Sequence, residues 1–340
     1  MTTATRTRAQ DSTTSAKAAE REARLAEVRE RLDEAVNVLV TGDDWARAMR
    51  CAARFRSRSF NNTLLIWMQH AAAYEAGLTS APEPTYVAGF QQWKALGRHV
   101  SKGMRGYQIL APVTARFASA NPKDLASWYR LTKGAKPAPG ETVRSRMIGS
   151  RVAYVWDVSA TEGAPLPEQP RPQLLQGEAP AGLWVGLAAQ VAAHGYTLHD
   201  AASATEIHGA NGVTNYVHKT VHVRADMDDA ARVKTLTHEL AHVLQGATRD
   251  DVDGTLSDAP RHRGIAEVEA ESVALMVGAA HDLDTTGYTV PYVAGWAAST
   301  NSDPAEVVRS TAERVRTMAL QILAELDTDQ TPTGTPEPPA

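Results

Sequence analysis

The stretch Thr235–Gly246, TLTHELAHVLQG, decides how the second half of this 340-residue chain is interpreted. It places His238 and His242 four positions apart, with Glu239 directly after the first histidine. In an α-helix, positions i and i+4 lie on one face, one turn apart, so the two imidazoles project together. The apolar residues of the stretch form a separate stripe for the core, which leaves the histidines on another side. This spacing is typical of a zinc-hydrolase helix, in which the glutamate acts on a metal-bound water.

A catalytic zinc site needs a third protein ligand and an open position for water. The segment GIAEVEAESVALMV, from Gly264, places Glu267 and Glu271 four positions apart on one predicted helical face. We expect Glu267 to be the third ligand and Glu271 to be the carboxylate that orients a ligand histidine. The reverse assignment of the two glutamates stays open, and His262 is an alternative third ligand. Glu239 would then be the general base of a hydrolase that uses Zn²⁺, or another divalent ion such as Mn²⁺.

The composition is that of a globular protein in solution, with 43% apolar and 22% charged residues. No apolar run is long enough to span a bilayer, and the N-terminus lacks the apolar segment of a signal peptide. Cys51 is the single cysteine, so no internal disulfide can form, which fits a reducing cytoplasm. The sequence therefore predicts a cytoplasmic protein without a membrane partner, and it does not indicate the oligomeric state.

Length and local composition divide the chain into two domains of an α+β protein, because 340 residues exceed one typical core. The proline-rich run APLPEQPRPQ marks the boundary between them. Residues 117–143, which include TKGAKPAPGET, are predicted to form a mobile loop. The predicted organisation is a disordered segment over 1–16, a first domain over 17–170, a linker over 171–177, a second domain over 178–326 and a disordered tail over 327–340.

The first domain carries a basic surplus that favours a partner with phosphate groups. Residues 46–156 hold 17 Lys and Arg against four acidic residues. Cations bind phosphates, aromatic faces stack on unpaired bases, and glycines let a loop backbone approach a phosphate. Trp93 has a second interpretation as a core residue, because large aromatic side chains are usually buried. The predicted nucleic-acid contacts are Arg54, Arg56, Arg58, Asn61, Trp93, Lys94, Arg98, Lys102, Arg105 and Tyr107.

Both halves together resemble one known family. SFNNTLLIWMQ, VAGFQQWKALGRHVSKGMRGYQILAPV and RVAYVWDVSATEGAPLPE resemble the N-terminal single-stranded-DNA-binding domain of ArdC-type antirestriction proteins, over residues 20–168. KTLTHELAHVLQG with AEVEAESVAL resembles the zincin-like C-terminal domain of the same proteins and of ImmA/IrrE metallopeptidases, over residues 178–325. The resemblance implies a mixed helix and sheet domain followed by a minimal zincin domain. It also implies a divalent ion held by the two histidines and Glu267, with Glu239 as base.

The leading functional hypothesis is a protein that binds single-stranded DNA and carries a zinc-dependent, gluzincin-like metallopeptidase domain. Its role would be antirestriction or the protection of mobile-element DNA. An alternative is a regulatory metallopeptidase that cleaves a repressor-type protein and uses its first domain to dock that protein. A third is a DNA-binding decoy whose metal is structural. The sequence specifies neither a protein substrate nor the native metal, the DNA preference or whether the origin is host or mobile element.

Overall fold

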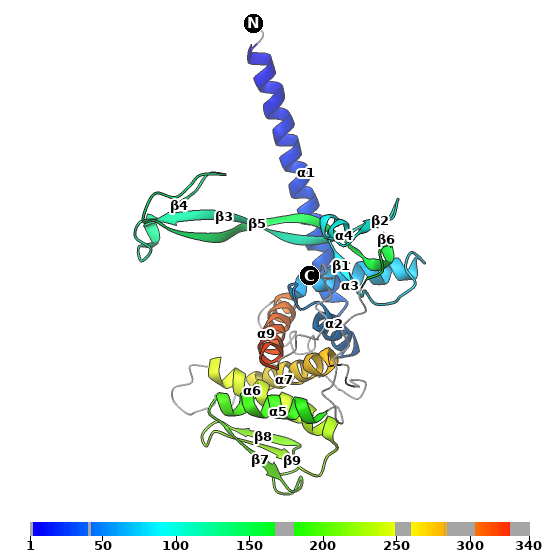
Figure 1. Cartoon of the computed structure of the whole chain (residues 1–340), viewed down its shortest axis with the longest axis vertical. Coiled ribbons are helices and arrows are strands. Elements are labelled where there is room, and N and C mark those ends of the chain that lie inside the picture. Colours follow the sequence, from blue (N-terminus) through cyan, green and yellow to red (C-terminus); the bar gives the residue numbers. More distant parts are fainter. Residues whose placement is uncertain are drawn as a thin grey trace.

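The computed structural model describes residues 3–39, 42–166, 180–248, 260–281, 283 and 303–326. A long N-terminal helix and a two-stranded ribbon extend from a body of packed helices, with a small sheet at the opposite end (Figure 1). The predicted α+β class is confirmed. None of the described helices combines the length and apolarity that crossing a lipid bilayer requires.

Three helices open the chain: α1 (Thr3–Asn37), α2 (Gly42–Arg54) and α3 (Phe60–Glu75). The helical backbone of α1 starts within residues 1–16, whose disorder stays a prediction. No glycine or proline occurs before α2 to interrupt this helix. At α3 the hydroxyl of Ser59 accepts a hydrogen bond from the third helical amide and caps the N-terminus.

An antiparallel sheet with the strand order β1-β5-β3-β4 follows these helices. Its two long strands form the ribbon that projects to one side in Figure 1, with β4 near the tip. A short helix and a two-stranded pair, β2 with β6, complete this half of the molecule. The elements are β1 (Val87–Ala88), α4 (Phe90–Ala95), β2 (Arg98–Val100), β3 (Tyr107–Ser119), β4 (Tyr129–Arg130), β5 (Thr142–Asp157) and β6 (Thr161–Gly163).

The segment 117–143 forms the outer end of the ribbon, and TKGAKPAPGET (132–142) within it is turns and irregular backbone up to the start of β5, as expected for a loop. It contains the end of β3, a 3-10 turn η1 (Leu125–Ser127), β4 and the start of β5. The Asp124 carboxylate caps η1, and the Tyr129 hydroxyl donates to Glu141 at 2.8 Å. The glycines and prolines of this segment predicted its turns. The pairing of β3 with β5 was not predicted, because the paired residues are far apart in the sequence.

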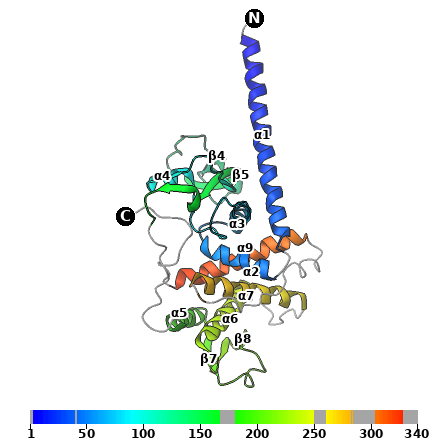
Figure 2. The same cartoon turned by 90° about the vertical axis from the view of Figure 1, so that its right-hand side faces the viewer.

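The described residues of the second half form α5, then a three-stranded sheet, and then α6, α7 and α9. The sheet has the order β7-β9-β8, with β7 parallel and β8 antiparallel to the central strand. Figure 2 shows α2 and α9 lying over α7, with α6 and the small sheet below it. The elements are α5 (Pro180–Ala193), β7 (Thr197–Ala201), β8 (Gly212–Asn215), β9 (Thr220–Arg224), α6 (Asp229–Thr248), α7 (Pro260–Ala280) and α9 (Pro304–Glu325).

One hydrophobic core crosses the predicted domain boundary. Buried side chains of α1, α2 and α3 belong to the same cluster as those of α5, α6, α7 and α9. At its centre the indole Nε1 of Trp45, on α2, donates to the hydroxyl of Ser272, on α7, at 2.8 Å. The helices of the first half therefore pack directly on the helix that carries the predicted third ligand. The predicted linker, 171–177, and the predicted tail, 327–340, lie outside the described residues.

Candidate metal centre and nucleic-acid surface

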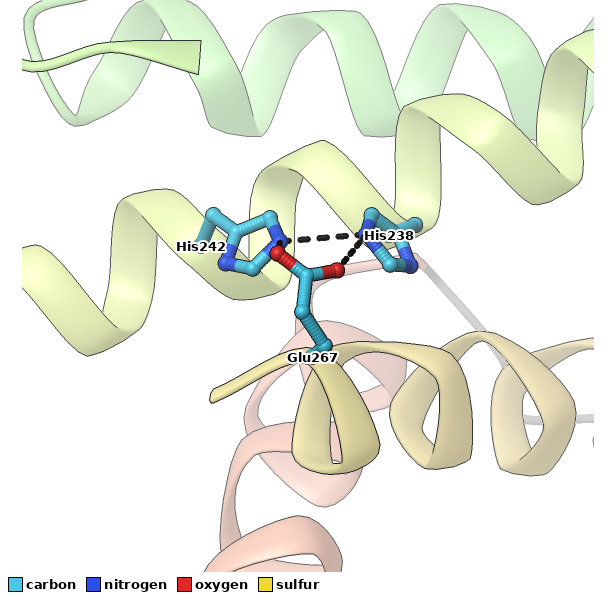
Figure 3. A group of neighbouring side chains, drawn as sticks. All are labelled: His238, His242 and Glu267. Carbon is cyan, nitrogen blue, oxygen red and sulfur yellow. Dashed lines mark hydrogen bonds and ion pairs between the residues drawn. The ribbon is translucent and has the colours of Figure 1, made fainter. Parts of the chain in front are cut away.

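His238, His242 and Glu267 converge from two helices (Figure 3). The two histidines lie on α6, and their Nε2 atoms are 3.0 Å apart. Glu267, on α7, brings one carboxylate oxygen to 3.3 Å from the Nε2 of His238 and the other to 3.5 Å from the Nε2 of His242. One ligand atom from each residue lies within 4.8 Å of the other two. Two imidazole nitrogens and one carboxylate oxygen form a donor set that zinc accepts.

Glu271 lies where the orienting carboxylate was predicted. Its Oε2 is 3.2 Å from the Nδ1 of His238, and its Oε1 is 2.5 Å from the Nζ of Lys234. A carboxylate is an acceptor, so the Nδ1 of His238 carries the proton and donates it. In the neutral imidazole this leaves the lone pair on Nε2, which faces the centre.

Gln245 orients the second histidine, and sequence reasoning missed it. The Nδ1 of His242 is 3.0 Å from the Gln245 Oε1. The amide nitrogen of Gln245 donates to the carbonyl of Ala266 at 3.0 Å and to Glu269 at 3.2 Å. Because the amide nitrogen is engaged with acceptors, Oε1 accepts from Nδ1 and the lone pair of His242 also lies on Nε2. The available signal was spacing, since Gln245 follows His242 by three residues and lies on the same helical face.

The centre is arranged to hold positive charge. Two nitrogen lone pairs that face each other at 3.0 Å repel, unless a proton or a cation lies between them. Burial opposes protonation of His238, but hydrogen bonds to Glu267 and Glu271 outweigh it and raise the pKa of His238 to about 9. Hydrogen bonds from His238 and His242 hold the pKa of Glu267 far below its usual value. The residues present therefore fit a divalent cation.

Solvent reaches the centre from one side. The side chain of Glu267 is 57% exposed, whereas those of His238 and His242 are 19% and 12% exposed. A hydrolytic metal site needs such an opening for water and substrate. His262, the alternative third ligand, has its backbone in α7, but its side chain lies outside the described ones.

Glu239 is fixed between α6 and the edge strand β8. Its side chain is buried, and its Oε2 accepts a hydrogen bond from the Thr214 hydroxyl at 2.7 Å. Gly212 makes room for it, since a Cβ at that position would lie 2.7 Å from the Glu239 Oε1. The predicted general base thus has a single defined orientation, next in sequence to the first histidine.

Several of the predicted nucleic-acid contacts lie on the surface of the first half. Arg54 is exposed but already pairs with Glu83, at 2.6 Å. Asn61 is half-buried near the start of α3. Within the described part of the chain, no carboxylate pairs with the three remaining exposed cations. These cations are Lys94, Lys102 and Arg105.

Other predicted contacts are engaged inside the fold. Trp93 is 0% exposed and donates from Nε1 to the carbonyl of Trp156 at 3.0 Å. Its predicted role as a stacking platform is wrong, because the ring anchors α4 against β5. Arg58 donates to the Val87 carbonyl at 2.7 Å, and Arg98 donates to the hydroxyl and carbonyl of the first residue of β6. These two arginines hold strands in place.

Arg56 and Arg58 are half-buried, and burial lowers the pKa of each guanidinium. The carbonyl of Arg56 accepts a hydrogen bond from Arg316 on α9 at 2.9 Å. The arginine cluster that precedes α3 therefore helps to join α9 to the first half. Of the three arginines that precede α3, Arg54 is exposed to solvent and the other two are half-buried.

The turn before β3 borders a cavity of about 930 Å³, which α1 and α3 close from the other sides. Arg105 and Tyr107, both predicted contacts, line it together with Gly103 and Gly106. The Tyr107 hydroxyl is 2.9 Å from the Nδ1 of His70, and burial raises the pKa of the phenol. This cavity is the place where the predicted cation, aromatic ring and glycine turn meet.

The cavity also contains residues that the sequence did not single out. Arg31 of α1 donates to the Oε1 of Gln108 at 2.5 Å, and the amide of Gln108 donates to the Tyr154 hydroxyl at 3.4 Å. Tyr154 is 42% exposed, so solvent reaches its side chain. A guanidinium group, an amide and an exposed ring are the groups that contact phosphates and unpaired bases.

The first half matches a known family. Residues 19–154 fit the model of the N-terminal domain of anti-restriction factor ArdC. The resemblance of this half to ArdC-type antirestriction proteins is thereby confirmed, while the matched residues end before the half that carries His238 and His242. The chain is also similar to the crystal structures of the antirestriction ArdC protein from the R388 plasmid. The metal-free structure is 17% identical and the Mn(II)-bound one 19%, each with a TM-score of 0.44 over 79% of this chain and 85% of that chain. No curated protein matches the sequence.

Proposed function

We propose that this chain is an antirestriction-type protein that binds single-stranded DNA through its first half and hydrolyses peptide bonds at a metal centre in its second half. The convergence of two imidazole Nε2 atoms and the Glu267 carboxylate carries the metal part of this proposal. The match over residues 19–154 supports the antirestriction role and a DNA partner. Zn²⁺ is the proposed ion because of its preference for nitrogen ligands, with Mn²⁺ as the alternative.

In the proposed reaction, His238, His242 and Glu267 hold the ion. When bound, Zn²⁺ would lower the pKa of a water molecule to about 7 and would polarise a carbonyl group. Glu239, oriented by the Thr214 hydroxyl, accepts the proton from the attacking water and passes it to the leaving amine. Glu271 and Gln245 keep the two imidazoles in the tautomer that presents Nε2 to the ion.

The proposed single-strand site is the cavity beside the turn at 101–107. Lys102 and Arg105 would contact phosphates, and the Tyr154 ring would stack on a base. Gly106 is required for the shape of the turn, because a Cβ there would lie 2.8 Å from the Trp156 indole. The site needs no base-specific hydrogen bonds, so we expect little sequence preference.

Elemental analysis of protein purified without chelator tests the metal centre. We expect about one divalent ion per chain in the wild type and a loss of the ion in His238→Ala and in His242→Ala. Glu239→Gln should keep the ion but abolish hydrolysis of a fluorogenic peptide library. His199→Ala, which removes an exposed histidine of β7, is the matched control and should change neither property. A metal-free wild type would overturn the proposed centre.

Fluorescence anisotropy with a labelled single-stranded oligonucleotide tests the DNA part. Each phosphate contact contributes a slope of about −0.7 to the dependence of log affinity on log salt. The double variant Lys102→Glu/Arg105→Glu should therefore bind about tenfold more weakly and show a slope flatter by about 1.4. Lys219→Glu, an exposed charge reversal in the second half, is the control. Equal affinities of the double variant and the wild type would contradict the assignment of the turn.

A further inference from the structure

We propose that the outer part of the β3–β5 ribbon, residues 114–151, grips double-stranded DNA next to the single strand bound at the turn. We call this segment the ribbon arm. It projects away from the helical body in Figure 1, with β4 near its tip. The binding of a single strand at the turn is part of the proposed function, on which this inference rests. The binding of a duplex is inferred from the ribbon arm alone.

The ribbon arm is strongly basic. It holds eight Lys and Arg against two acidic residues. All eight basic side chains are exposed, and none pairs with a carboxylate in the part of the chain that the structure describes. The two acidic groups, Asp124 and Glu141, accept hydrogen bonds from donors of the arm itself. The basic charge is therefore left for a partner with many phosphates.

Cations lie on both faces of the ribbon. Residues that pair across antiparallel strands share a face, and Arg144 pairs with Phe117 while Arg146 pairs with Ala115. Arg116 directly precedes Phe117 in β3, so it points to the opposite face. A single strand follows one face of a protein, whereas a duplex groove has a phosphate backbone along each wall. The major groove of DNA, about 12 Å wide, admits a two-stranded ribbon.

Two arginines of the ribbon arm are held in place by an aromatic ring. The guanidinium carbons of Arg144 and Arg146 lie 5.0 Å and 5.8 Å from the centre of the Trp128 ring. These cation–π contacts restrict two long side chains, which lowers the entropy cost of binding a phosphate backbone.

The ribbon connects the two proposed DNA sites. Tyr107, at the cavity, begins β3, and Ser119 ends the same strand within the arm. At about 3.3 Å per residue the strand is about 40 Å long, close to one helical turn of DNA. A single strand at the cavity and a duplex along the arm are thus spaced for one continuous molecule. The fit predicts a preference for the junction at which a duplex passes into a single strand.

The test compares three labelled oligonucleotides in the full-length protein: a single strand, a blunt duplex and a duplex with a single-stranded tail. We expect the tailed duplex to bind wild type at least about tenfold more tightly than the single strand. Arg144→Glu/Arg146→Glu should reduce tailed-duplex affinity to the single-strand level and leave single-strand affinity unchanged. The salt slope of the tailed duplex should become flatter by about 1.8, at about 0.9 per phosphate.

A second pair of substitutions protects the test against misfolding, because Arg144 and Arg146 pack on Trp128. Lys133→Glu/Lys136→Glu changes two exposed side chains of the arm and should cause the same selective loss. Lys219→Glu is again the control outside the arm. If wild type binds the single strand but gains nothing from the duplex, the inference is wrong and the proposed function stands. If wild type binds no single strand while the arm still binds the blunt duplex, the proposed single-strand site is wrong and the duplex grip stands.

Discussion

Glu271 and Gln245, the two side chains that orient the imidazoles, differ in how easily their roles can be predicted from the sequence. Glu271 lies four residues after Glu267 on one helix, so helical spacing alone indicates that it faces the centre. Gln245 is also one turn away from a histidine, but its role depends on the carbonyl of Ala266 on another helix. Only the folded chain fixes which end of the amide faces His242. Local geometry therefore predicted which side chains converge, and tertiary contacts determine which imidazole nitrogens face one another.

Removing the acceptor at Gln245 should weaken metal binding without removing a ligand. Gln245→Met leaves the Nδ1 hydrogen of His242 unpaired, and loss of such an orienting group lowers metal affinity by about 10- to 100-fold. Gln190→Met is the matched control, since that glutamine is also buried and bonds only to a carbonyl on α9. Competition with a chromophoric chelator measures both variants. Wild-type affinity in Gln245→Met would show that the amide does not set the imidazole tautomer.

Cys51 should be unreactive until the protein unfolds. Burial raises the pKa of this thiol to about 12, with Glu83 adding to the effect and Arg54 opposing it. The thiolate is the reactive form, so at pH 8 almost none of it is present in the folded state. We expect an aromatic disulfide reagent to label no thiol in native protein and one thiol per chain in denaturant. Rapid labelling of the native protein would show that the α2 surface around Cys51 opens in solution.

At the scale of elements, the composition predicted a basic surface in the first half, but not which of its predicted contact residues are exposed and which are buried. The sequence left Trp93 open between a stacking platform and a core residue, and the structure places it fully in the core. Sequence spacing cannot decide this, because α4 has only six residues and the Trp93 indole bonds to Trp156, which lies 63 residues away in the chain. The ribbon arm shows the same limit, since local punctuation predicted its turns but not the register of β3 with β5.

Trp93→Ala should therefore act on stability and not selectively on DNA. Truncating a fully buried tryptophan costs about 3–5 kcal/mol, and here it also removes the hydrogen bond to the Trp156 carbonyl. The denaturant midpoint should fall clearly, while the fraction that remains folded binds single-stranded DNA with wild-type affinity. Lys94→Ala, one residue later and exposed, should show the opposite pattern. A selective loss of DNA binding in stable Trp93→Ala protein would restore the stacking interpretation.

At the scale of the whole molecule, the two predicted domains share one core. The basic surplus of 46–156 contrasts with 11 Lys and Arg against 23 acidic residues over 171–340. The buried faces of α2 and α7 nevertheless pack together. The distribution of charged residues along the sequence describes the protein surface. The division of a chain into folding units depends instead on which side chains are buried together. A proline-rich run therefore marks a change in charge here without marking an independent core.

This shared core predicts that metal binding stabilises the first half as well. A ligand that binds only the folded state adds about 2.7 kcal/mol of stability at a concentration 100 times its Kd. Because α7 carries Glu267 on one side and contacts Trp45 through Ser272 on another, that stabilisation should reach α2. Hydrogen exchange with and without Zn²⁺ should show slower exchange in peptides covering both α6 and α2, together with a single thermal transition that shifts upward. His238→Ala should abolish both the slower exchange and the shift of the thermal transition. A fragment covering 17–170 would lack the second-half helices on which α1, α2 and α3 pack, so we expect it to expose apolar faces and aggregate. Two separate transitions, with only the later one sensitive to metal, would show that the halves fold independently despite their contact.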